Sequence, residues 1–120
     1  MNAKYFVPFE TAKQLKENGY NGTVDYYYMA NGQMCFDAME VSNDTLDLKN
    51  NGTIAAPTYH EVINWLDGKK KFIFAEYRGY ATYDWVAFIR DEHEKDFYLS
   101  AFPTREEALQ AAILKALEMI

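Results

Sequence analysis

The sequence has few of the residues that carry common enzymatic and metal chemistry. Its 120 residues include one cysteine, Cys35, and two histidines, His60 and His93. A single cysteine excludes an intramolecular disulfide, and its place between Met34 and Phe36 is typical of a small buried apolar residue. Nucleophilic catalysis needs a base beside Ser, Cys or Thr, so two histidines leave few arrangements. We therefore expect no catalytic residue, no metal ligand and no cofactor.

Phosphate-binding loops and long hydrophobic runs are also missing. The six glycines are isolated at turns, and no Gly-x-Gly-x-x-Gly or Gly-Lys-Thr motif occurs. The apolar stretches are far shorter than the ~20 residues that a membrane span requires, and the N-terminus lacks the apolar run of a signal peptide. We therefore expect a cytoplasmic protein with no membrane contact. The Asn-x-Thr triplets at Asn21, Asn43 and Asn51 then indicate turn chemistry rather than glycosylation.

Charge and aromatic content narrow the class of partner. The formal net charge is −6, and Lys and Arg form no basic stripe. Nucleic-acid backbones are bound by clustered basic residues, so this acidic chain is poorly suited to them. Aromatic residues make up 17% of the chain, an excess that favours strands and a contact surface. The length fits a single domain over residues 1–120.

The first half of the chain predicts a helix, a hairpin and a loop. Residues 9–18 follow Pro8 and end at Asn18-Gly19, which are favourable helix start and stop signals. The β-branched and aromatic segments 23–29 and 34–39 flank an Asn-Gly turn and predict a hairpin. Residues 41–56 are rich in Asn, Asp and Thr, and they predict a long loop with a short strand around 45–48.

The second half predicts two helices around a three-stranded meander. Thr58 and Glu61 form a Thr-x-x-Glu capping box, and Thr104 and Glu107 form another. Between these helices, segments with strand character occur at 72–77, 82–90 and 96–102. Their short connections imply antiparallel pairing. We therefore predict an α+β fold of order α-β-β-α-β-β-β-α, with three helices and an antiparallel sheet made of the hairpin and the meander.

Strand 82–90 carries apolar residues on both of its faces. Tyr83, Trp85 and Ile89 share one face, and Val86 and Phe88 share the other. Helices on one side would leave the second face open, so either helices flank both sides or another molecule covers it. The candidate binding residues are the aromatic residues of this strand and its neighbours, namely Tyr77, Tyr80, Tyr83, Trp85 and Tyr98.

Three segments carry a resemblance to a known group. They are FVPFETAKQLKENGY at 6–20, AAPTYHEVINWL at 55–66 and TREEALQAAILKAL at 104–117. In this order they resemble a family of small uncharacterised proteins of gut Bacteroidetes and their phages or prophages. The resemblance implies a compact accessory protein rather than a metabolic enzyme, and it assigns no role to any residue.

These observations favour a noncatalytic accessory or binding protein that acts by protein–protein contact, including contact within a homodimer. Three alternatives stay open. One is a small enzyme that uses carboxylates with His60 or His93. Another is single-strand nucleic-acid binding through an aromatic sheet face. The third is a divalent-cation loop in the charged run 91–96 around His93, against which stands an ordinary solvated hairpin tip. The identity of the partner does not follow from the sequence.

Overall fold

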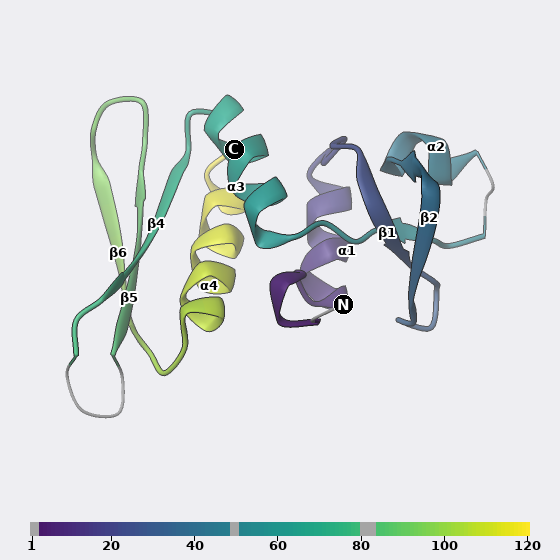
Figure 1. Cartoon of the computed structure of the whole chain (residues 1–120). Helices are drawn as coiled ribbons and strands as arrows, with labels where there is room; N and C mark the ends of the chain where they lie inside the picture. The colour runs from purple at the N-terminus through teal and green to yellow at the C-terminus, as the bar shows by residue number, and fades with distance from the viewer. Residues whose placement is uncertain (1–2, 49–50, 80–83) are drawn as a thin grey trace. The chain divides into compact units, whose positions relative to one another are not determined.

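The structure is a computed structural model that describes residues 3–48, 51–79 and 84–120 (Figure 1). The chain divides into two compact units, Met1–Val62 and Ile63–Ile120. We call them the N-terminal and the C-terminal unit and describe each by itself. The expectation of a single domain over residues 1–120 stays a prediction.

The α+β class and the antiparallel pairing predicted from the sequence are confirmed. The strands form two separate three-stranded antiparallel sheets, of order β2-β1-β3 and β4-β5-β6, instead of one sheet. The described residues contain four α-helices where three were predicted. In chain order the elements are η1 (Ala3–Tyr5), α1 (Phe9–Glu17), β1 (Val24–Tyr28), β2 (Met34–Val41), α2 (Asn43–Asp47), β3 (Ile54–Ala55), α3 (Tyr59–Gly68), β4 (Phe72–Tyr77), β5 (Trp85–Arg90), β6 (Asp96–Phe102) and α4 (Arg105–Glu118).

The additional helix α2 lies where the sequence predicted a loop with a short strand at 45–48, and that strand is wrong. Ser42 and Thr45 form a reciprocal capping box: the Ser42 Oγ accepts from the Thr45 amide at 3.4 Å, and the Thr45 Oγ1 accepts from the Ser42 amide at 2.9 Å. These bonds satisfy amides that a helix start otherwise leaves unpaired. The strand of this region comes later, at β3, where Ile54 pairs with Tyr28 of β1.

The core of the N-terminal unit lies between α1 and the face of β1 that carries Val24 and Tyr28. Both side chains are buried, as is Leu15 of α1. The Tyr28 hydroxyl donates to the Val7 carbonyl at 2.6 Å, so the buried phenol has a partner. The ring of Phe9 meets that of Tyr28 edge to face at 5.4 Å, a favourable aromatic geometry.

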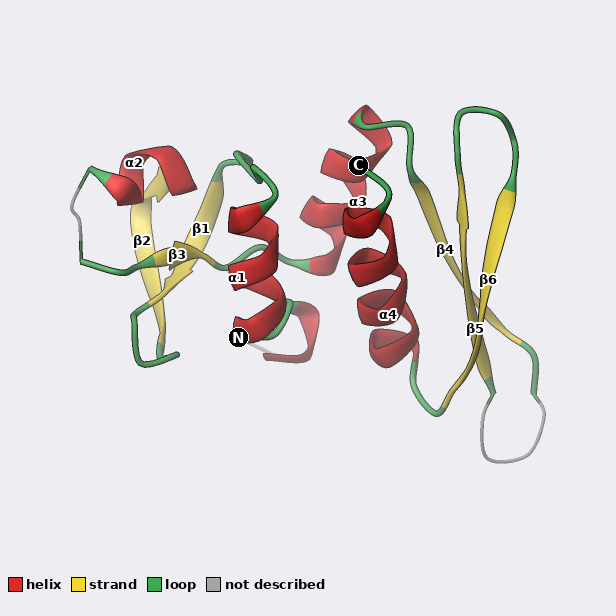
Figure 2. Ribbon diagram, turned by 180° about the vertical axis from the view of Figure 1, so that it is seen from behind, coloured by secondary structure: helices red, strands yellow, loops and turns green. Residues whose placement is uncertain are grey.

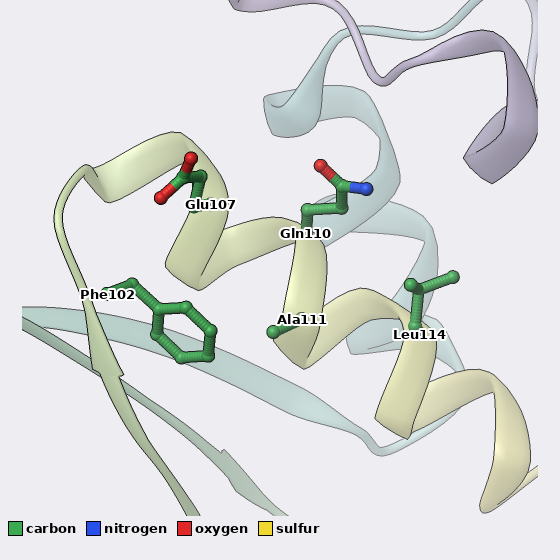
Figure 3. A pocket seen from close by; sticks show the side chains of 5 residues that line it. All are labelled: Phe102, Glu107, Gln110, Ala111 and Leu114. Atoms are coloured by element: carbon green, nitrogen blue, oxygen red, sulfur yellow. The ribbon is translucent and has the colours of Figure 1, made fainter.

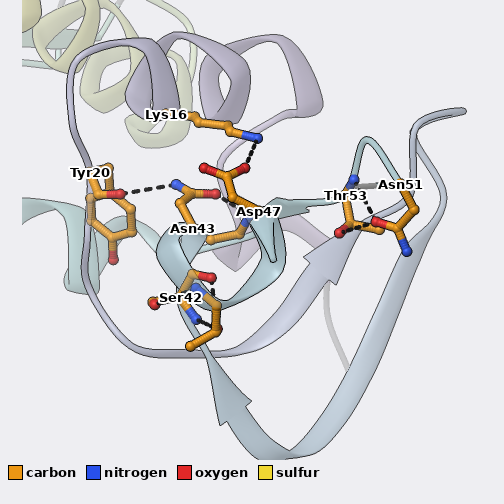
Figure 4. Close-up of polar contacts among 9 residues, drawn as sticks. Lys16, Tyr20, Ser42, Asn43, Asp47, Asn51 and Thr53 are labelled. Atoms are coloured by element: carbon orange, nitrogen blue, oxygen red, sulfur yellow. Dashed lines mark hydrogen bonds and ion pairs between the residues drawn. The ribbon is translucent and has the colours of Figure 1, made fainter. Parts of the chain in front are cut away.

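Asn43 connects three segments of the N-terminal unit through its buried amide (Figure 4). Its Nδ2 donates to the Tyr20 carbonyl at 3.0 Å, and its Oδ1 accepts from the Ala55 amide at 2.9 Å. The Asn51 Oδ1 accepts from the amide and the hydroxyl of Thr53. In both triplets the asparagine side chain therefore bonds within the chain, as turn and capping chemistry requires.

The meander predicted in the second half is confirmed in the C-terminal unit. Helix α4 lies along one face of the β4-β5-β6 sheet (Figure 2). Ala87 and Ile89 of β5 and Ala112 of α4 have no exposed surface, and such small residues let the helix approach the sheet closely. The Thr58–Glu61 capping box at α3 is present in both directions. At α4 the Thr104 hydroxyl accepts from the Glu107 amide at 3.2 Å.

Candidate functional site: an open aromatic sheet face

Strand pairing in the C-terminal sheet places three aromatic side chains in one row. Phe74 of β4 lies opposite Phe88 of β5, and Phe88 lies opposite Tyr98 of β6. Residues directly opposite each other share a face, and successive residues alternate. This row therefore lies on the side of the sheet away from Ile89 and α4. We call that side the outer face, and its described strand residues are Phe72, Phe74, Glu76, Val86, Phe88, Arg90, Asp96 and Tyr98.

The three rings contact one another and remain accessible. Phe74 and Phe88 are stacked, with centroids 4.8 Å apart and planes at 16°. Phe88 and Tyr98 are tilted at 30°, with centroids 5.4 Å apart. Phe74 is 41% exposed and Tyr98 is 62% exposed. Among the described elements of this unit, the helix α4 packs on the opposite side, so a contiguous aromatic surface faces outward.

The charges of the outer face are paired within the face. At one end of the row, the Arg90 guanidinium donates to both carboxylate oxygens of Asp96, at 2.8 and 3.2 Å. The Arg90 guanidinium also lies 5.7 Å from the Phe74 ring centroid. At the other end, Arg78 Nη2 lies 2.9 Å from Glu76 Oε2. Two cations and two anions therefore leave this surface neutral, although the chain carries −6.

The candidate residues from the sequence separate into three groups. Tyr77 and Trp85 come together as a stacked pair, with centroids 5.5 Å apart, in the register of the face that α4 covers. Tyr98 lies on the outer face. Tyr80 and Tyr83 lie outside the described residues. The sequence placed Ile89 and Phe88 on opposite faces of the strand, and their burial agrees with that assignment.

Sequence reasoning missed Phe74 and the Arg90–Asp96 pair. The alternation of Phe72 and Phe74 against Ile73 was a usable signal, since it places two rings on one face of β4. Assigning that face to the same side as Tyr98 required the register through β5, which the sequence does not show. The outer face is therefore the contact surface that strand pairing adds to the sequence-based set.

A separate shallow pocket lies between the end of β6 and α4. It has a volume of about 310 Å³ and is lined by Phe102 of β6 and by Glu107, Gln110, Ala111 and Leu114 of α4 (Figure 3). Glu107 is the one titratable residue among these. Neither histidine lines it, and acid–base chemistry needs a second group within reach. This pocket therefore gives no support to an enzyme built on carboxylates with His60 or His93.

The charged connection between β5 and β6 has internal partners. The Asp91 carboxylate accepts from the amides of His93 and Lys95, at 2.9 and 3.0 Å. Glu92 binds the largely buried Lys71 at 3.0 Å, and the His93 side chain is 80% exposed. Within the described parts of the chain, no group of three or more His, Cys, Asp or Glu side chains could hold a metal ion. This run has the structure of a hydrogen-bonded hairpin connection.

The same carboxylates predict acid sensitivity of the C-terminal unit. The pKa of Asp96 is lowered from 3.8 by its hydrogen bond from Arg90, and the pKa of Glu92 is lowered from 4.5 by that from Lys71. A carboxylate with a depressed pKa stabilises the fold above its unfolded-state value, and this stabilisation is lost as the pH falls through the folded-state value. We expect the free energy of unfolding to decrease below about pH 4.5.

Urea unfolding followed by tryptophan fluorescence, at several values between about pH 6 and pH 2.5, measures this decrease. Asp96→Asn removes one titrating group, so its stability should fall less steeply with acid than that of the wild type. Equal slopes for the two proteins would contradict the assignment to this pair.

Searches with this chain found no matching protein-family model, curated protein or solved structure. In the described residues, no helix is both long enough and apolar enough to cross a membrane. The function is therefore argued from the outer face itself.

Proposed function

We propose that this chain is a noncatalytic accessory protein of the cytoplasm that binds a protein partner through the outer face. The observation that carries the proposal is the exposed row of Phe74, Phe88 and Tyr98 on a rigid three-stranded sheet. Aromatic side chains bury large areas with few rotatable bonds, and they are enriched at the centres of protein interfaces. The resemblance to small proteins of gut Bacteroidetes and their phages fits an accessory role.

A protein partner suits this surface better than a nucleic acid. Single-strand binders combine stacking rings with a positively charged groove that follows the phosphates. On the outer face, Arg90 and Arg78 are each engaged by a carboxylate, and the whole chain is acidic. Ring stacking without free positive charge favours an uncharged, apolar contact. The stacked pair of Tyr77 and Trp85 at the end of the sheet remains a second candidate contact.

Site-specific photocrosslinking tests the proposal. A photoreactive benzoylphenylalanine is introduced in place of Tyr98, and the labelled protein is irradiated in an extract of the source organism. The control carries the same group in place of Phe36 of β2, which is also 62% exposed. We expect a discrete adduct from position 98 that is absent from position 36.

Competition decides whether the adduct reports this face. Excess unlabelled wild type should suppress the position 98 adduct, whereas excess of a Phe74→Thr, Tyr98→Thr double variant should not. Threonine is chosen because its β-branched side chain retains strand propensity. Suppression by both competitors, or adducts of equal yield at both positions, would overturn the proposal.

A further inference from the structure

We infer that the partner of the outer face is a second copy of this chain, in a two-fold symmetric dimer; this rests on the proposed function. The first argument is electrostatic. Two chains of charge −6 repel each other, so self-association requires a surface on which that charge is locally absent. The outer face, with the two internal ion pairs Arg90–Asp96 and Glu76–Arg78, meets this requirement.

The order of charges along β4 and β5 selects the symmetry axis. Glu76 and Arg90 lie at opposite ends of the face, on either side of the aromatic row. A two-fold axis parallel to the strands would superpose Arg90 on Arg90 of the other copy. An axis perpendicular to the strands reverses them, so that the end with Arg90 meets the end with Glu76. Only the perpendicular axis brings opposite charges together, and like charges in contact are costly.

The perpendicular axis also stacks the aromatic row on itself. Because β4, β5 and β6 each keep their position across the sheet, Phe88 meets Phe88 at the centre and Tyr98 meets Tyr98 at one side. Packed sheets lie about 10 Å apart, with side chains of the two inner faces interdigitating. The dimer therefore has an aromatic centre and two symmetry-related contacts between Arg90 and Glu76 at its ends.

The size of the face sets the expected strength. With a strand spacing of about 4.8 Å and a rise of about 3.3 Å per residue, three strands of about six residues span roughly 300 Å². A standard interface buries about 800 Å² per partner. The dimer is therefore weak and reversible, and it forms at high protein concentration.

The experiment is sedimentation equilibrium of the whole chain from about 10 µM to about 1 mM. The wild type should move from a mass of 14.0 kDa toward twice that value. Phe74→Thr with Tyr98→Thr should remain monomeric over the whole range. The matched control is Phe36→Thr, since Phe36 equals Tyr98 in exposure and its ring lies 5.3 Å from that of Tyr26. This control should dimerise as the wild type does.

The axis is tested with charge variants. Glu76→Arg should weaken the dimer at least tenfold, because it opposes Arg90 of the other copy, and so should Arg90→Glu. An equimolar mixture of the two variants should dimerise more strongly than either alone. Circular dichroism of each variant confirms that it is folded before its mass is interpreted. If Glu76→Arg dimerises like the wild type, the perpendicular axis is overturned.

A wild type that stays at 14.0 kDa at every concentration, or a dimer lost only in Phe36→Thr, would overturn the second-copy inference. The proposed function fails separately, by loss of the position 98 crosslink. A crosslinked adduct of a different protein, together with a monomeric mass, would leave the proposed function standing without the dimer.

Discussion

Replacing Asn43 with alanine is expected to lower the free energy of unfolding of the N-terminal unit by about 2–4 kcal/mol. The side chain is 4% exposed and makes two hydrogen bonds to backbone groups from different segments. Truncation leaves the Tyr20 carbonyl and the buried Ala55 amide without this partner. A buried polar group that loses its partner costs more than the net value of the bond, because water does not replace it.

Amide hydrogen exchange measured by NMR is the direct readout. The Ala55 amide should exchange faster in Asn43→Ala, and urea unfolding should give the change in free energy. Asn18→Ala is the matched control, because Asn18 Nδ2 also donates to a backbone carbonyl, that of Gln14 at 2.8 Å, but is exposed. Water substitutes there, so we expect a cost below about 1 kcal/mol. Equal costs at the two positions would contradict the role of Asn43.

The contrast between two capping boxes shows where sequence reasoning succeeded and failed in the fold. At α3 the Thr58–Glu61 box has the Thr-x-x-Glu pattern that marks helix starts, and it was predicted. At α2 the box pairs Ser42 with Thr45, whose hydroxyl takes the place of the usual carboxylate. The surrounding Asn, Asp and Thr residues favour turns equally well. Local chemistry therefore permitted both a loop and a helix, and the bonds of Asn43 to Tyr20 and Ala55 favour the helix.

Sheet composition depended on pairing between distant segments. The hairpin of β1 and β2 and the meander of β4, β5 and β6 follow from short connections, and both were predicted. Strand β3 has two residues, too few for an alternating pattern, and it pairs with β1 across more than twenty residues of chain. The number of sheets could not be predicted because no local signal states which strands share hydrogen bonds.

The candidate site was predicted in part for the same reason. Tyr98 was identified by its residue type, and Tyr77 and Trp85 were assigned to the same surface as Tyr98. The register shows that Tyr77 and Trp85 lie on the other side of the sheet. Aromatic content thus indicated a contact surface, whereas membership of one face required knowing which residues lie opposite Phe88.

The two faces of β5 predict opposite consequences for adjacent parts of the C-terminal unit. Ile89 has no exposed surface and faces α4. Ile89→Ala removes buried methyl and methylene groups and leaves a cavity, which costs about 2–4 kcal/mol. Phe74→Thr acts on the outer face, where the ring is already 41% exposed. We expect it to cost below about 1 kcal/mol in unfolding while weakening association through the outer face.

Both effects can be followed with the same probe, since Trp65 and Trp85 both lie within Ile63–Ile120. Urea unfolding by tryptophan fluorescence, at a concentration where the chain is monomeric, gives the stability of each variant. Position 98 crosslinking gives its binding. Ile89→Ala should lose stability and, under conditions where it is folded, retain the crosslink, whereas Phe74→Thr should retain stability and lose the crosslink. If Phe74→Thr destabilised the fold as much as Ile89→Ala, the outer-face aromatics would be part of the core, and a surface that binds a partner would require another location.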